Sequence, residues 1–156
     1  MNISKKGLTV LTAGLMGYLC VITTTYAAGS IKIREKDINH ECSIPATVGD
    51  HALDRRGCTN DQAYTVRFVD VPSALNITFF SDRKNDYCKK DSEQDWIIET
   101  RTLKNTTTTE DYIGIGTMAH IADNTLIAPG LLKIRLVHRR GDYYGKLSCV
   151  RIENHK

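Results

Sequence analysis

Short runs in which apolar and polar residues alternate follow one another along most of this chain, and they constrain its fold more than any other feature. Gly, Pro, Asn and Asp, the usual turn residues, separate the runs. Such a series is typical of an all-β sandwich or small barrel. We predict strands at residues 30–34, 64–71, 74–80, 95–103, 112–118, 131–138 and 146–152. The best helix candidate is the short segment 118–124, so we expect little helix.

Residues 1–27 have the three-part pattern of a secretory signal peptide. Lys5 and Lys6 precede the apolar stretch 8–22, and the segment ends in small residues, which favours cleavage after Ala27 within one residue. The stretch is shorter than the roughly 20 residues that span a bilayer. We therefore expect residues 28–156 to form a single exported domain of a bacterial protein, secreted or periplasmic, with no transmembrane segment in the mature chain.

Four cysteines follow this leader: Cys42, Cys58, Cys88 and Cys149. In an oxidising compartment an even number of cysteines predicts two disulfides, and three pairings are open. Cys42 and Cys58 flank a stretch that resembles a surface loop, which favours their pairing and leaves Cys88 for Cys149. None of them forms the close pair of cysteines that a zinc site needs, so we expect no metal on these residues.

The charge balance argues against a nucleic-acid partner. The net charge of +3 falls to +1 when Lys5 and Lys6 of the leader are removed, and no basic stretch stands out. The segment Gly114-Ile115-Gly116 lacks the third glycine of a phosphate-binding loop, and we interpret it as punctuation within a strand. No serine has the surroundings of a catalytic nucleophile.

The sequence contains no catalytic constellation, and we expect no enzymatic activity. One enzymatic alternative stays open: a small hydrolase that uses a carboxylate and a nearby histidine. Its candidate histidines are His40, His51, His120 and His138.

Two groups of residues are weak candidates for a metal site. Asp91, Glu93 and Asp95 alternate ahead of a predicted strand, where three carboxylates can converge on a hard cation. They lack the glycine and the bidentate glutamate of an EF-hand. The other group is the pair Asn60-Asp61. We expect no cofactor, with Ca²⁺ as the only metal considered.

Three segments carry a resemblance to a known family. They are Cys58-Thr59-Asn60-Asp61 with the following YTVRFVDVPSALNITFFSD, the pair Asp95-Trp96, and GKLSCVRIEN near the end. Over about residues 56–154 the chain resembles small exported bacterial proteins of βγ-crystallin-like type. That resemblance implies two Greek-key sheets packed face to face, with calcium bound through an Asn/Asp pair and a following hydroxyl residue. Tyr64 stands where that hydroxyl residue belongs.

Pattern and resemblance together predict one all-β domain, a disulfide-stapled Greek-key β-sandwich of βγ-crystallin-like or immunoglobulin-like type. It would contain about 6 to 8 strands. A second resemblance is to chaperone-usher pilins: Ile127-Ala128-Pro129-Gly130 is similar to the turn before their late strands, and SIKIREKDI is similar to a donor strand. Periplasmic lysozyme inhibitors are also small, β-rich and disulfide-bonded, but the S-G-x-x-Y signature of one such family is absent.

The segment 138–144 is the best candidate for contact with a partner. We predict that it forms a hairpin between the last two strands, with Gly141-Asp142 in the turn. Its candidate binding residues are Arg139, Arg140, Asp142, Tyr143 and Tyr144, since Arg and Tyr are enriched at interface hot spots. We therefore expect an exported, non-enzymatic protein-binding module, either an envelope inhibitor or immunity factor or a secreted effector of a virulence system. The alternative is a minor pilin or adhesin subunit.

Overall fold

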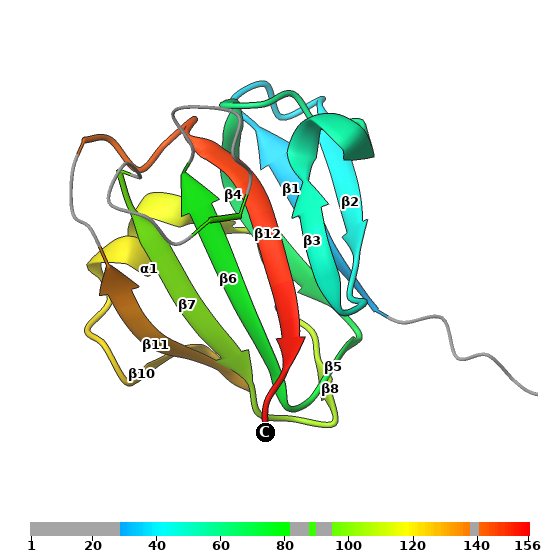
Figure 1. Ribbon diagram of the computed structural model, residues 1–156, viewed down its shortest axis with the longest axis vertical. Helices are drawn as coiled ribbons and strands as arrows, with labels where there is room; N and C mark the ends of the chain where they lie inside the picture. The colour runs from blue at the N-terminus through cyan, green and yellow to red at the C-terminus, as the bar shows by residue number, and fades with distance from the viewer. Residues whose placement is uncertain (1–28, 82–87, 90–94, 138–140) are drawn as a thin grey trace, which may run out of the picture.

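Two antiparallel sheets face each other in the computed structural model (Figure 1). The structure describes residues 29–81, 88–89, 95–137 and 141–156. In the larger sheet the strand order is β10-β11-β7-β6-β12-β3, and in the smaller sheet it is β2-β1-β4-β9. The predicted fold class, an all-β sandwich with disulfides, is confirmed. The signal peptide predicted over residues 1–27 lies outside the described residues, and no helix in the described part is long and apolar enough to cross a membrane.

The strands of the larger sheet are β3 (Gly49–Ala52), β6 (Leu75–Ser81), β7 (Ile97–Thr102), β10 (Thr125–Ala128), β11 (Leu131–Val137) and β12 (Leu147–Asn154). Those of the smaller sheet are β1 (Ser30–Glu35), β2 (Glu41–Pro45), β4 (Ala63–Val69) and β9 (Ile113–Gly114). A separate ladder pairs β5 (Val71–Pro72) with β8 (Thr106–Thr107), and two short helices complete the described chain: η1, a 3₁₀-helix (Leu53–Arg56), and α1 (Ile115–His120).

Six of the seven predicted strands are confirmed to within two residues at either end. The run 64–71 is divided into β4 and β5, because Asp70 between them has a positive φ of 51°. The predicted number of strands is too low, since the described residues contain twelve. The additional strands have two to five residues, too few to show an alternation in the sequence.

Strands β12, β6, β7 and β11 have the order of a Greek key, in which the fourth strand in the chain returns to lie beside the first. Strands β11 and β12 are therefore separated by β6 and β7. The predicted hairpin over residues 138–144 is wrong, because β11 and β12 are not neighbours in the sheet; the described residues 141–146 lie at one end of the larger sheet, at the top in Figure 1. Gly141 has the predicted positive φ, 76°, but its turn belongs to a crossover rather than to a hairpin.

Apolar side chains of the central strands form two hydrophobic clusters, one on each face of the larger sheet. The main cluster lies between the sheets, where the ring of Phe68 on β4 meets that of Phe79 on β6 at 6.4 Å. Neighbouring residues point to the opposite face of the larger sheet, where Phe80 and Ile97 pack against the disulfide Cys88–Cys149. Central strands thus carry apolar residues on both faces, which explains why β6 is almost continuously buried.

Both favoured disulfide pairings are confirmed. Cys42 pairs with Cys58 at a Cα–Cα distance of 5.3 Å, and Cys88 pairs with Cys149 at 5.4 Å. The loop expected between Cys42 and Cys58 is wrong, because this stretch contains most of β2, all of β3 and η1. It crosses from the smaller sheet to the larger one, and Ile44 of β2 is fully buried.

The strand predicted at residues 112–118 is wrong beyond β9. From Ile115 the chain forms α1, which buries Ile115, Met118 and Ala119, a helical i, i+3, i+4 spacing. The helix predicted at 118–124 is displaced accordingly, since α1 ends at His120. Lys133 of β11, which is 1% exposed, donates hydrogen bonds from its ammonium group to the carbonyl oxygens of Ala119 and Ile121. This buried cation therefore satisfies carbonyls that the helix leaves unpaired at its end.

Candidate functional site

The segment 141–146 carries three of the predicted binding residues and crosses the upper end of the sandwich in Figure 1. Arg139 and Arg140 lie outside the described residues. Three hydrogen bonds hold the segment: the Trp96 indole N–H donates to the Asp142 carbonyl at 3.2 Å, the Tyr144 amide to Asp142 Oδ1 at 3.0 Å, and the Gly145 amide to the Ala63 carbonyl at 3.0 Å. The backbone here is therefore tied to both sheets.

Tyr143 is fixed between two other rings. Its ring centroid lies 6.3 Å from that of Trp96, which is fully buried, and 5.3 Å from that of His120 in an edge-to-face contact. The His120 Nδ1–H donates to the Gly116 carbonyl at 2.6 Å, which fixes the imidazole. Tyr143 is partly buried as a result.

Tyr144 stacks on Tyr64 of β4 with a centroid distance of 5.4 Å and remains 40% exposed. Gly116 of α1 lies beneath it: a Cβ at this position would come within 2.5 Å of the Tyr144 ring, so a larger residue here would displace the ring. The interpretation of Gly116 as strand punctuation is thus wrong. We call Tyr64, His120, Tyr143 and Tyr144 the aromatic cap.

Tyr143 and Tyr144 lie in a bend and a turn that precede β12. Tyr64 and His120 come from distant elements, and nothing local in the sequence links them to the segment. Sequence reasoning therefore missed half of the aromatic cap.

The weak metal candidates do not form a metal-binding group in the part of the chain that the structure describes. Asp91 and Glu93 lie outside that part. Asn60 donates a hydrogen bond from its side-chain amide to Asp61 Oδ2 at 3.3 Å, and Asp61 Oδ1 accepts one from the Ser148 hydroxyl at 3.1 Å. Asp95 is 4% exposed and lies at the upper end of the sandwich next to Gly141.

One of the candidate histidines lies beside a carboxylate. His40 Nδ1 is 3.4 Å from Glu35 Oε2, but the His40 side chain is 74% exposed, so the pair is in contact with solvent. His51 is buried and bonds to the Thr47 carbonyl and to Arg56, and His120 supports the aromatic cap. His138 lies outside the described residues. Among the described candidate histidines, the exposed pair His40–Glu35 is therefore the one that the hydrolase alternative could use.

The largest lowering of a carboxyl pKa in the described chain is at Glu41, in a cluster on the smaller sheet. Glu41 accepts hydrogen bonds from the Tyr112 hydroxyl and, at 2.9 Å, from the Lys32 ammonium. The Tyr112 hydrogen bond is the main cause that lowers the pKa of Glu41 from 4.5 to about 2. The Arg34 guanidinium lies 3.7 Å from the centroid of the Tyr112 ring, a cation–π contact. These contacts link β1, which carries Lys32 and Arg34, with β2, which carries Glu41, and with Tyr112, the residue before β9.

We expect this cluster to make stability depend on acid pH. Because the pKa of Glu41 is lower in the folded chain, its contribution is complete above pH 4.5 and is lost as the pH falls toward 2. The side chain is 32% exposed, so the contribution should be on the order of 1 kcal/mol. Glu41→Gln should lose this amount at pH 7 and show a smaller fall in unfolding free energy between pH 5 and pH 2, measured by urea unfolding. An equal fall in the wild type and the variant would contradict the assignment.

Fold and cap define a class: a disulfide-bonded all-β sandwich whose upper end presents a supported aromatic surface. Comparison with known proteins adds no family, because no protein-family model, curated protein or solved structure matches the chain. The resemblance to βγ-crystallin-like proteins therefore stays a prediction.

Proposed function

We propose that the protein is an exported, non-enzymatic module that binds a protein partner through the aromatic cap. The observation that carries the proposal is the exposure of Tyr144, 40%, on a backbone segment tied by hydrogen bonds to Trp96 and Ala63. Tyr residues dominate interface hot spots, and a side chain that is already ordered loses little entropy on binding. An envelope inhibitor or immunity factor and a secreted effector are the two roles that fit this module.

Export is part of the proposal. Its support is the pattern of residues 1–27 together with the two disulfides, since paired cysteines persist in oxidising compartments.

The pilin alternative receives less support. Its candidate donor strand, SIKIREKDI, overlaps β1, and β1 pairs on one side with β2 and on the other with β4. A strand paired on both edges completes its own sheet and is not available to a neighbouring subunit. The Pro129-Gly130 turn simply connects β10 to β11.

The test is affinity capture with a matched pair of variants. The oxidised protein would be immobilised and exposed to extracts of its own cell envelope, of rival bacteria and of host cells, and the retained proteins identified by mass spectrometry. We expect one stoichiometric protein on the wild type and a loss of affinity of about 30-fold in Tyr144→Ala, the effect of removing a hot spot of about 2 kcal/mol. Leu103→Ala is the control, because Leu103 is 50% exposed at the opposite end of β7.

Arg139→Ala with Arg140→Ala tests the residues that the sequence alone nominates, and should weaken the same interaction without changing the melting temperature. The proposal fails if nothing is retained above a reduced, unfolded control. It also fails if Tyr144→Ala, shown to be folded, retains the partner as well as Leu103→Ala does.

A further inference from the structure

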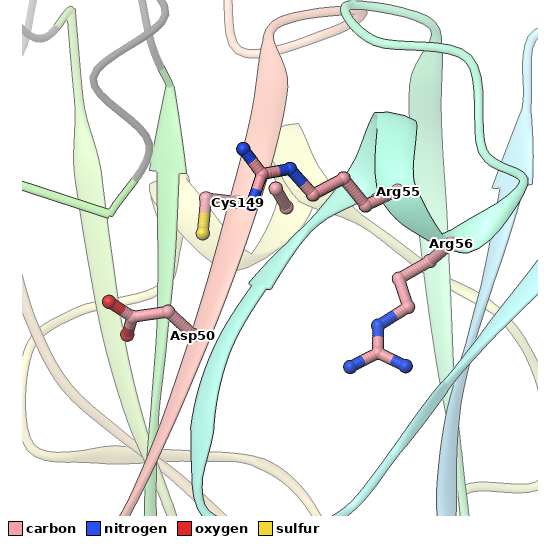
Figure 2. Close-up of a pocket in the computed structure, with 5 residues that line it drawn as sticks. Asp50, Arg55, Arg56 and Cys149 are labelled. Carbon is pink, nitrogen blue, oxygen red and sulfur yellow. The ribbon is translucent and has the colours of Figure 1, made fainter.

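A pocket of about 440 Å³ lies beside η1 and extends along the outer face of the larger sheet (Figure 2). Its lining residues are Asp50, Ala52, Arg55, Arg56 and Cys149. The volume is within the range of sites for small molecules, about 300–1,000 Å³. In Figure 2 the Arg55 side chain extends toward Cys149, with Asp50 at the lower end of the same side, whereas the Arg56 side chain runs down on the other side of β3.

The positive charge of the pocket comes from Arg55 and Arg56. Its acidic residue, Asp50, accepts two hydrogen bonds from the Arg151 guanidinium, at 2.6 and 2.9 Å. The Arg151 hydrogen bonds hold the pKa of Asp50 below its usual value, so Asp50 is ionised at neutral pH and balances the charge of Arg151. No carboxylate of the described residues forms an ion pair with Arg55 or Arg56.

Arg56 is held in place by a neutral group. The His51 Nε2–H donates to the Thr47 carbonyl at 2.8 Å, because a carbonyl can only accept, and His51 Nδ1 therefore accepts from Arg56 Nη2 at 3.2 Å. His51 is 3% exposed, so this relay is fixed within the fold. An uncharged acceptor orients the guanidinium without neutralising it, and a guanidinium has five N–H donors, so Arg56 keeps both its charge and free donors.

We propose that this pocket binds the oxyanion group of a ligand, a carboxylate or a phosphate, through the Arg55 guanidinium, with Arg56 as a second positive charge at the edge of the pocket. Planar guanidinium groups match both anions in charge and geometry, and Arg is the residue of choice for such recognition. The site is independent of the aromatic cap, because the two share no residue. A ligand held here would contact η1 and β12 on the side of the sheet that the disulfide Cys88–Cys149 covers.

The test is an NMR titration of the ¹⁵N-labelled, oxidised protein with inorganic phosphate and, separately, with succinate, at constant ionic strength set by NaCl. We expect saturable shifts of the amide signals of residues 50–56 and 149. Arg55→Gln should raise the dissociation constant about tenfold, the effect of losing one charge-assisted hydrogen bond. The double variant Arg55→Gln with Arg56→Gln should show no saturable binding. Arg135→Gln removes the same charge from β11 and should change the constant by less than about twofold.

Arg55 forms no hydrogen bond within the described chain, so Arg55→Gln should fold normally and keep the experiment decisive. Tighter binding of phosphate than of succinate would identify a phosphate ligand, and the reverse would identify a carboxylate. Shifts that rise linearly with concentration, or that are equal in the wild type and in Arg55→Gln, would show only ionic screening and overturn the proposal. Because capture through the aromatic cap is measured separately, the failure of one proposal leaves the other standing.

Discussion

Removing the disulfide Cys88–Cys149 by alanine substitution at both positions is expected to lower the free energy of unfolding by about 4 kcal/mol. The bridge closes a loop with a sequence separation of 61 residues, and the loss of chain entropy on closing a loop of that length gives this figure. Both cysteines are fully buried and pack with Phe80 and Ile97, so their loss also loosens the outer cluster. Urea unfolding of the oxidised protein would measure the effect.

The matched control is the alanine pair at Cys42 and Cys58. That bridge spans a separation of 16 residues, for which the same estimate gives about 3 kcal/mol. A smaller loss for Cys88→Ala with Cys149→Ala than for the control pair would contradict the argument. It would mean that the outer face of the larger sheet is held by strand pairing alone.

Lys133→Met is expected to lower the free energy of unfolding by about 3 kcal/mol, although it replaces a buried charge with an apolar side chain of similar length. The partners of Lys133 include two main-chain carbonyls, of Ala119 and Ile121, which no side-chain substitution can remove. Asp123 Oδ1 also lies 3.5 Å from the ammonium group. Each buried acceptor left without a donor costs about 1–3 kcal/mol.

A lysine that is exposed to solvent provides the comparison. Lys36→Met removes the same charge at an exposed position between β1 and β2 and should change stability by less than about 0.5 kcal/mol. Chemical denaturation of both variants gives the difference, and hydrogen exchange at the Ile121 amide, which donates to the Thr117 carbonyl, reports on the last turn of α1. A loss below about 1 kcal/mol in Lys133→Met would show that the helix end finds other donors.

Most of the fold could be predicted because the long strands alternate. Val66 and Phe68 of β4 and Val150 and Ile152 of β12 face the core two residues apart, and this spacing is visible in the sequence of the strand itself. The short helix α1 gives no comparable signal. Ile115, Met118 and Ala119 show the helical spacing only once, and so few residues are also compatible with the alternation of a strand. The edge strands β2 and β3 are too short to alternate visibly.

Connections between strands follow a different rule. The turn chemistry of Gly141-Asp142 predicts a reversal of the chain, and the chain does turn there. Which strand comes next in the sheet depends on packing at long range, and the sequence around a turn does not contain that information. The predicted hairpin between β11 and β12 is wrong for this reason.

The candidate site divides in the same way. Tyr143 and Tyr144 could be nominated from residue type and position, whereas their contacts with Tyr64, His120 and Gly116 depend on the crossover that brings three elements together. No sequence motif marks the proposed oxyanion pocket, because Arg55 and Arg56 form it together with Cys149 of β12, which lies far along the chain. Disulfide pairing was easier, because the two bridges join cysteines whose alternatives are few.

The position of β12 also sets an order for folding. This strand lies between β6 and β3, and it pairs with β6 from Leu147 to Asn154 and with β3 from Cys149 to Ile152. Until Leu147–Asn154 has been synthesised, β3 has no partner in the larger sheet and β6 has one open edge. Contacts of such long range form late and slowly. The chain must therefore be almost complete before its central sheet can close, and a nascent chain that stops short of β12 would expose two unpaired strand edges.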